Sequence, residues 1–129
     1  MMHERSVGPG NLLVGVNEAA DANNLSDLER KHIPIIEAPE TVRKEESFCA
    51  RVTVGGLLAH PNEYKHFIQA IELYADETFL ARVDLTAVRT CPKVTFCVSL
   101  RYPAEELRAC ARCNLHGAWV GRKAIAVTE

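Results

Sequence analysis

Four segments of the chain alternate apolar and polar residues with a period of two. They cover residues 48–54, 79–85, 94–100 and 107–111. Because successive side chains of a strand point to opposite faces, this alternation predicts strands with one buried face. Two longer, mixed runs, at residues 66–74 and 119–127, predict further strands, the first buried on both faces. The chain is therefore expected to be all-β.

Turn-forming dipeptides separate these segments, among them Gly55-Gly56 and Cys91-Pro92. Short strands with regular breaks predict an antiparallel β-sandwich of about seven strands. Residues 1–28 show no sustained periodicity and are read as an N-terminal extension, which leaves residues 29–129 as the domain. Within the extension, Ser26 and Glu29 have the spacing of a capping box, which predicts a single helical turn.

Composition excludes several classes of protein. The length of 129 residues suits one domain. A net charge of −2 does not indicate a nucleic-acid binder, and no apolar run approaches the ~20 residues of a membrane span. The five cysteines are an odd number, and no export signal is apparent, so we expect reduced thiols and a cytoplasmic protein.

Histidine and cysteine, the residues that bind transition metals, gather in three short segments. These are residues 31–34, 60–66 and 113–117. Together they offer four imidazoles and one thiolate: His32, His60, His66, His116 and Cys113. Five ligands are one too many for tetrahedral zinc, and a mixture of imidazole and thiolate suits iron or copper. A structural zinc site built from Cys110, Cys113 and two histidines stays open as a weaker alternative.

The same segments resemble the superoxide reductase family, also called neelaredoxin and desulfoferrodoxin. The resemblance is carried by residues 31–37, by His60-Pro61 with His66, by residues 71–74 and by residues 113–119, in the family's order and spacing. It covers roughly residues 29–121. It implies an immunoglobulin-like sandwich that reduces superoxide to hydrogen peroxide.

The resemblance also implies roles for individual residues and partners. One mononuclear non-haem iron would have His32, His60, His66 and His116 as equatorial ligands and Cys113 as the axial ligand. Lys31 would steer superoxide and help protonation. An external donor such as rubredoxin would supply electrons, and the chain would form a homodimer or a homotetramer. The alternative is a non-enzymatic electron-transfer or redox-sensing protein with the same iron site.

Two positions depart from the family's pattern. The family commonly has Glu just before the Lys-His pair, whereas this chain has Arg30 there and Glu29 one residue earlier. We expect Glu29 not to take over that role, on the assumption that the segment is extended and a shift of one residue reverses the side chain. Residues 1–48 contain no cysteine, so we expect a one-iron protein.

Overall fold

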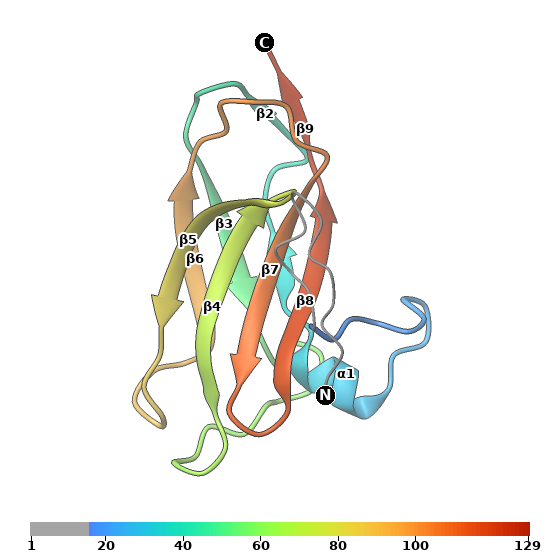
Figure 1. Cartoon of the computed structure of the whole chain (residues 1–129), viewed down its shortest axis with the longest axis vertical. Helices are drawn as coiled ribbons and strands as arrows, with labels where there is room; N and C mark the ends of the chain where they lie inside the picture. The colour runs from blue at the N-terminus through green and yellow to red at the C-terminus, as the bar shows by residue number, and fades with distance from the viewer. Residues whose placement is uncertain (1–15) are drawn as a thin grey trace, which may run out of the picture.

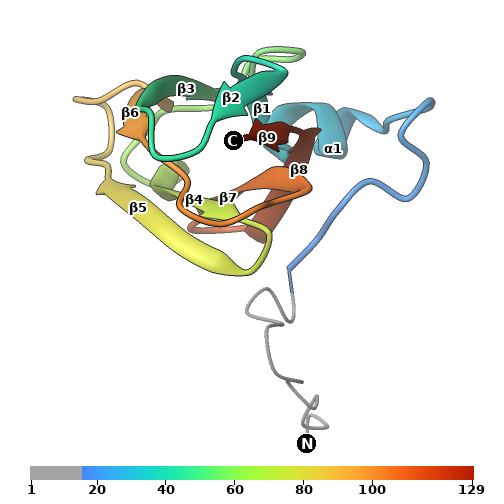
Figure 2. The same cartoon turned by 90° about the horizontal axis from the view of Figure 1, so that it is seen from above.

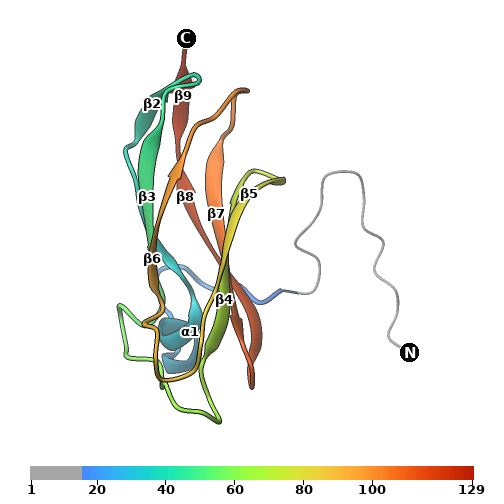
Figure 3. The same ribbon diagram turned by 90° about the vertical axis from the view of Figure 1, so that its left-hand side faces the viewer.

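Two β-sheets pack face to face and enclose the core (Figures 2 and 3). The computed structural model describes residues 16–129. Its strands are β1 (Ile35–Glu37), β2 (Thr41–Arg43), β3 (Phe48–Thr53), β4 (Ile68–Ala75), β5 (Thr78–Asp84), β6 (Lys93–Val98), β7 (Glu106–Cys113), β8 (Gly117–Ala124) and β9 (Ala126–Thr128), and its helix is α1 (Asp27–His32). No helix in this part of the chain has the length and apolar character needed to cross a bilayer.

One layer has the strand order β1-β3-β6 and the other has the order β5-β4-β7-β8. All pairings within these two sheets are antiparallel. The two short strands β2 and β9 form a separate parallel pair at the end where the chain terminates (Figure 1). The predicted all-β sandwich is confirmed.

The strands predicted from alternation are present, and residues 16–129 form nine strands in place of about seven. The single strand predicted at residues 119–127 is instead two, β8 and β9, separated at Ile125. β1 and β2 were not predicted, because strands of three residues are too short to show a period of two. β4 is buried along nearly its whole length, as predicted for a strand covered on both faces.

The core lies between the sheets and fixes which face of each strand points inward. Ile71 and Leu73 from β4 and Leu107 from β7 are fully buried there. Burying an aliphatic side chain of this size stabilises a fold by about 1.5–3 kcal/mol. Shifting any of these strands by one residue would expose this apolar set, so the register is strongly specified.

The helix α1 begins and ends where the sequence provides signals. Ser26 is the N-cap, and a reciprocal capping box joins it to Glu29, which confirms the predicted helical turn. Ile33 has extended backbone angles (φ −71°, ψ 122°), as expected for a residue that precedes proline. Pro34 therefore directs the chain from the helix into β1.

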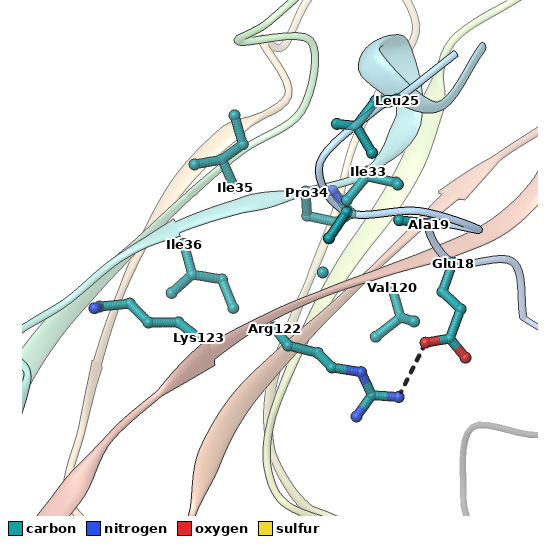
Figure 4. A pocket seen from close by; sticks show the side chains of 12 residues that line it. Glu18, Ala19, Leu25, Ile33, Pro34, Ile35, Ile36, Val120, Arg122 and Lys123 are labelled. Atoms are coloured by element: carbon teal, nitrogen blue, oxygen red, sulfur yellow. Dashed lines mark hydrogen bonds and ion pairs between the residues drawn. The ribbon is translucent and has the colours of Figure 1, made fainter. Parts of the chain in front are cut away.

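The segment before α1 runs along the edge strand β8. Asn17 pairs with Trp119 in a parallel bridge, and the Glu18 carboxylate lies 3.5 Å from the Arg122 guanidinium. A cleft of about 540 Å³ separates this segment from β1 and β8 (Figure 4). Apolar side chains of Leu25, Ile36 and their neighbours line most of it, and none of the predicted metal ligands does. The boundary between the N-terminal extension (residues 1–28) and the domain (residues 29–129) stays a prediction.

Candidate metal centre

Three segments of the chain meet at the end of the sandwich opposite the C-terminus. They are α1, the loop that precedes β4, and the turn between β7 and β8 (Figure 1). These are the three segments that carry the predicted ligands. Residues separated by more than 80 positions in the sequence therefore come together at one place.

Four of the five predicted ligands form a compact group. One ligand atom from each of His32, His60, His66 and Cys113 lies within 4.8 Å of every other. The fifth, His116, is adjacent, since its Nδ1 is 4.0 Å from the Cys113 sulfur. His32, His60 and Cys113 are buried, whereas His116 is exposed. One side of the group therefore faces the core, and His116 lies toward solvent.

The four imidazole rings are arranged as a square. Neighbouring centroids in the order His32, His60, His66, His116 are 4.7, 4.7, 5.0 and 5.0 Å apart, and each neighbouring pair meets edge to face. The diagonal between His32 and His66 is longer, at 6.3 Å, and those two rings are nearly parallel. Such a square is the arrangement that four equatorial ligands of an octahedral ion require.

Backbone hydrogen bonds orient two of these rings. His32 donates from Nδ1 to the carbonyl oxygen of Leu28 over 2.7 Å, and His60 donates from Nδ1 to the carbonyl oxygen of Pro61 over 2.6 Å. A neutral ring that donates from Nδ1 keeps an unprotonated lone pair on Nε2. Histidines that bind metals are commonly held by a hydrogen bond of this kind.

Several of the remaining ring nitrogens lack a hydrogen-bonding partner that would satisfy them. The Nε2 atoms of His32 and His60 face each other at 3.2 Å, so two lone pairs point at the same space. Nε2 of His66 is buried without any hydrogen bond. Burial lowers the pKa of His60 to about 4, and it lowers the pKa of His32 as well, so both rings are neutral at pH 7. The residues present therefore fit a bound cation.

Cys113 reaches this group because of the alternation along β7. Leu107, Ala109 and Ala111 face the core, and Cys113 continues that face. Opposite it, the pairing of β4 shifts between Ile68 and Ala70, next to the loop that carries His66. Such an irregularity commonly re-aims side chains beside a functional site.

Cys110 belongs to the other face of β7, where it lies across from Glu72. It is buried, and this burial raises the pKa of its thiol to about 11. Because three positions along a strand reverse the direction of a side chain, Cys110 and Cys113 do not point to one site. The alternative of a zinc site that uses both cysteines is wrong.

Asn114 is a positioning residue that sequence reasoning did not identify. Its side-chain oxygen accepts a hydrogen bond from the backbone of Phe67 over 2.9 Å, and its side-chain nitrogen donates to the carbonyl of Lys65 over 2.9 Å. These two residues flank His66. Asn114 therefore fixes the His66 loop against the turn that follows Cys113. That turn depends on Gly117, whose φ of +80° lies in the left-handed region that favours glycine.

Trp119 is a second such residue. Its indole stacks on His32 with centroids 5.0 Å apart, and its Nε1 donates to the carbonyl oxygen of His116 over 3.0 Å. One side chain thus contacts two corners of the square. The only signal in the sequence was that Trp119 lies within the motif beginning at Cys113.

Lys31 and Glu29 both lie on α1. Lys31 is half-buried, and its charge contributes to lowering the pKa of the adjacent His32, after burial and the neighbouring imidazoles. The expectation that this segment is extended is wrong, because residues 27–32 are helical. The Glu29 carboxylate instead accepts hydrogen bonds from the backbone of Ser26 (2.8 Å) and Ala20 (3.0 Å). These bonds lower its pKa and hold it at the start of the helix.

A family profile, curated relatives and solved structures match this chain. The desulfoferrodoxin family profile matches residues 24–122. A putative superoxide reductase from Methanocaldococcus jannaschii is 39% identical over 116 residues, which are 86% of this chain and 93% of the relative. The solved superoxide reductase (neelaredoxin) from Ignicoccus hospitalis has a TM-score of 0.67 and 42% identity, covering 74% of this chain and 80% of that one.

A third protein matches over more of the chain. The crystal structure of a putative superoxide reductase from Thermotoga maritima has a TM-score of 0.74 and 30% identity, and it covers 88% of this chain and 95% of that one. Residues 24–122 include all three segments that converge at the centre. On the agreement of sequence, fold and ligand-bearing segments, the chain belongs to the desulfoferrodoxin family.

Proposed function

We propose that His32, His60, His66, His116 and Cys113 bind one iron ion per chain, and that the chain there reduces superoxide to hydrogen peroxide. The observation that carries this proposal is the set of unsatisfied lone pairs on neutral imidazoles beside a buried thiol. Four imidazoles and one thiolate leave one position of an octahedral ion free for a small ligand. The superoxide reductases among the relatives favour this reaction over electron transfer or sensing alone.

Bound iron would supply the single electron that superoxide needs. The residues of the chain set the conditions for that transfer. Cys113 lies on the buried side of the square, 3.5 Å from Nε2 of His60, so its sulfur is shielded from solvent. We infer that the opposite side of the square is left for the substrate, because Cys113 occupies the buried side.

Lys31 would attract superoxide to the centre and would then assist its protonation. A cation beside the centre raises the encounter rate of a small anion, and salt screens the effect. Reduction of superoxide also consumes two protons, and the Lys31 ammonium can donate a hydrogen bond toward the incoming oxygen. Its place next to His32 on α1 is the support for both roles.

The test of the ligand set uses two buried cysteines on the same strand. Iron content and the visible spectrum of the oxidised protein are measured for the wild type, Cys113→Ser and Cys110→Ser. We expect the wild type and Cys110→Ser to contain iron with an intense thiolate-to-ferric band, and Cys113→Ser to lose that band. A band that survives in Cys113→Ser would refute the assignment of this thiolate.

The test of the reaction is its stoichiometry. A reductase supplied with an external electron donor forms one peroxide per superoxide and no dioxygen. A dismutase forms half as much peroxide and releases dioxygen. A redox sensor that the donor does not re-reduce would be oxidised once by superoxide and would form no more than one peroxide per chain. Oxygen-electrode and peroxide assays on the wild type separate these three outcomes.

A rubredoxin-like protein is the electron donor we propose. The loops around the centre expose three large hydrophobic side chains: Leu57, Tyr64 and Leu115, at 55, 70 and 59%. Exposed apolar side chains grouped beside a redox site suit a transient protein partner. Leu115→Glu should slow reduction by rubredoxin, whereas Phe79→Glu, on β5, removes an equally exposed side chain away from the centre and should not.

Two further expectations complete the proposal. All five cysteines are free thiols in the structure, which supports a reducing compartment such as the cytoplasm. A homodimer or homotetramer stays a prediction, and sedimentation of the purified protein would test it.

A further inference from the structure

Two cysteines outside the metal centre face each other on neighbouring strands. Cys49 in β3 and Cys97 in β6 are direct partners in the antiparallel register. On the same strands Ala50, Val52 and Phe96 point into the core. Cys49 and Cys97 therefore point outward, and both are exposed.

The hydrogen bonding of these strands places the two thiols close together. Val54 donates its backbone N–H to the carbonyl oxygen of Pro92 over 2.9 Å, and these two residues continue the same register. Directly opposed pairs alternate between hydrogen-bonded and non-hydrogen-bonded types along an antiparallel ladder. Because Val54 with Pro92 is a hydrogen-bonded pair, Cys49 with Cys97, five residues along, is a non-hydrogen-bonded pair.

This type of pair has the spacing that a disulfide needs. Opposed Cα atoms in a non-hydrogen-bonded pair are about 4.5 Å apart. Disulfides span Cα separations of about 4.4–6.8 Å, so the backbone needs no rearrangement to allow the bond. Each thiol also remains accessible to a small oxidant, since no strand covers this face of the β1-β3-β6 sheet among the described residues.

We propose that Cys49 and Cys97 form a dithiol that hydrogen peroxide converts to a disulfide across β3 and β6. One sulfur attacks the O–O bond and becomes a sulfenic acid as the first water leaves. The other sulfur then displaces the second water, and the S–S bond forms. Two thiols lose two hydrogens and two electrons, and one peroxide becomes two waters. An external dithiol restores the pair by thiol–disulfide exchange.

The proposed function would form this oxidant at the same molecule, but the chemistry at the pair does not depend on it. Cys49 is the second residue of β3, whereas the loop that carries His60 follows the far end of that strand. The pair therefore lies away from the metal ligands. Its oxidation would join two strands of one sheet and leave the ligand set unchanged.

The test treats the purified full-length protein, with its bound metal, with hydrogen peroxide and then with dithiothreitol. Intact mass and a non-reducing peptide map are compared for the wild type, Cys49→Ser, Cys97→Ser and Cys91→Ser. Cys91 is the matched control, because it is equally exposed but has no thiol opposite it. Added peroxide makes the result independent of superoxide turnover, so failure of one proposal does not decide the other.

We expect the wild type and Cys91→Ser to lose two hydrogens, to yield a crosslink between the peptides of Cys49 and Cys97, and to regain the hydrogens with dithiothreitol. Closing a loop of this length should raise the Tm of the oxidised form by about 10 °C. Neither Cys49→Ser nor Cys97→Ser should show the crosslink or the shift. Oxygen added to single cysteines, a crosslink through Cys91, or a bond between two chains would each overturn the proposal.

Discussion

Gly121 controls how closely the ligand-bearing helix approaches the sheet. A Cβ atom at this position would lie 2.0 Å from the carbonyl oxygen of Pro34 and 3.0 Å from its carbonyl carbon. Contacts below 3.0 Å do not occur for real Cβ atoms, so at least 1.0 Å of movement (3.0 − 2.0) is needed. The obstacle is backbone, and it lies two residues after His32. Gly121→Ala should therefore displace the chain that holds a proposed ligand.

The expected effects follow from that displacement. Overpacking a well-packed interior costs about 1–3 kcal/mol, which for a domain of this size lowers the Tm by about 4–12 °C. Ligand distances in metal sites hold to about 0.2 Å, so passing even a part of the movement to His32 should lower iron content. Thermal unfolding and iron analysis of the purified variant measure both effects.

Gly56→Ala is the matched control for this substitution. Its Cβ would meet only side-chain atoms, of Ile35 at 3.4 Å and of Thr53 at 3.5 Å, which are ordinary contacts. Both variants share the loss of backbone freedom that alanine brings to the unfolded chain. If Gly121→Ala retained full iron and a Tm within about 2 °C of Gly56→Ala, the reasoning on close approach would be refuted.

Three further predictions concern charge and burial. Lys31→Ala should slow the reaction with superoxide and weaken its dependence on salt while iron content is unchanged; rapid mixing at several ionic strengths tests this, and an unaltered salt dependence contradicts it. Cys110, whose thiol pKa burial raises to about 11, should resist iodoacetamide at pH 8 in the native protein while the exposed thiols react. Burial and then Glu72 raise the pKa of Tyr74 to about 12, so the native state keeps a proton that the unfolded state releases above pH 10. Stability should fall as pH rises from 10 to 12, and Tyr74→Phe should flatten that fall in urea titrations.

The sheet architecture could be predicted from the sequence because the alternation of apolar and polar residues is a local property of each strand. The strands β3, β5, β6 and β7 each carry a period of two, and the inward faces of β3 and β7 are the ones that their sequences predict. The short strands β1 and β2 form because they pair with β3 and β9, respectively, and not because of a pattern in their own sequences. The parallel pairing of β2 with β9 joins residues more than 80 positions apart, and three-residue segments contain no signal for it.

The sequence predicted which residue types make up the candidate site, but not how they are arranged. The order of the histidines and Cys113 indicated a metal centre, but their arrangement depends on contacts between distant segments. The hydrogen bond from the backbone of Phe67 to Asn114 spans 47 positions, and the stacking of Trp119 on His32 spans 87 (119 − 32). Neither contact leaves a periodic or spaced pattern in the sequence, because each forms only when the loops meet.

The helical start of the domain also explains how this chain can function with Arg30 where the family commonly has Glu. Glu29 accepts hydrogen bonds from the backbone N–H groups of Ser26 and Ala20, so moving it to the metal centre would exchange these bonds for bonds to water and would undo the capping box of α1. That Glu29 does not replace the family's glutamate stays a prediction, and these hydrogen bonds are a different argument for it from the extended chain first assumed. Arg30 and Lys31 then give the last turn of α1 two adjacent cations. We expect these two cations to attract superoxide and to make its capture sensitive to salt, which the ionic-strength series with Lys31→Ala tests.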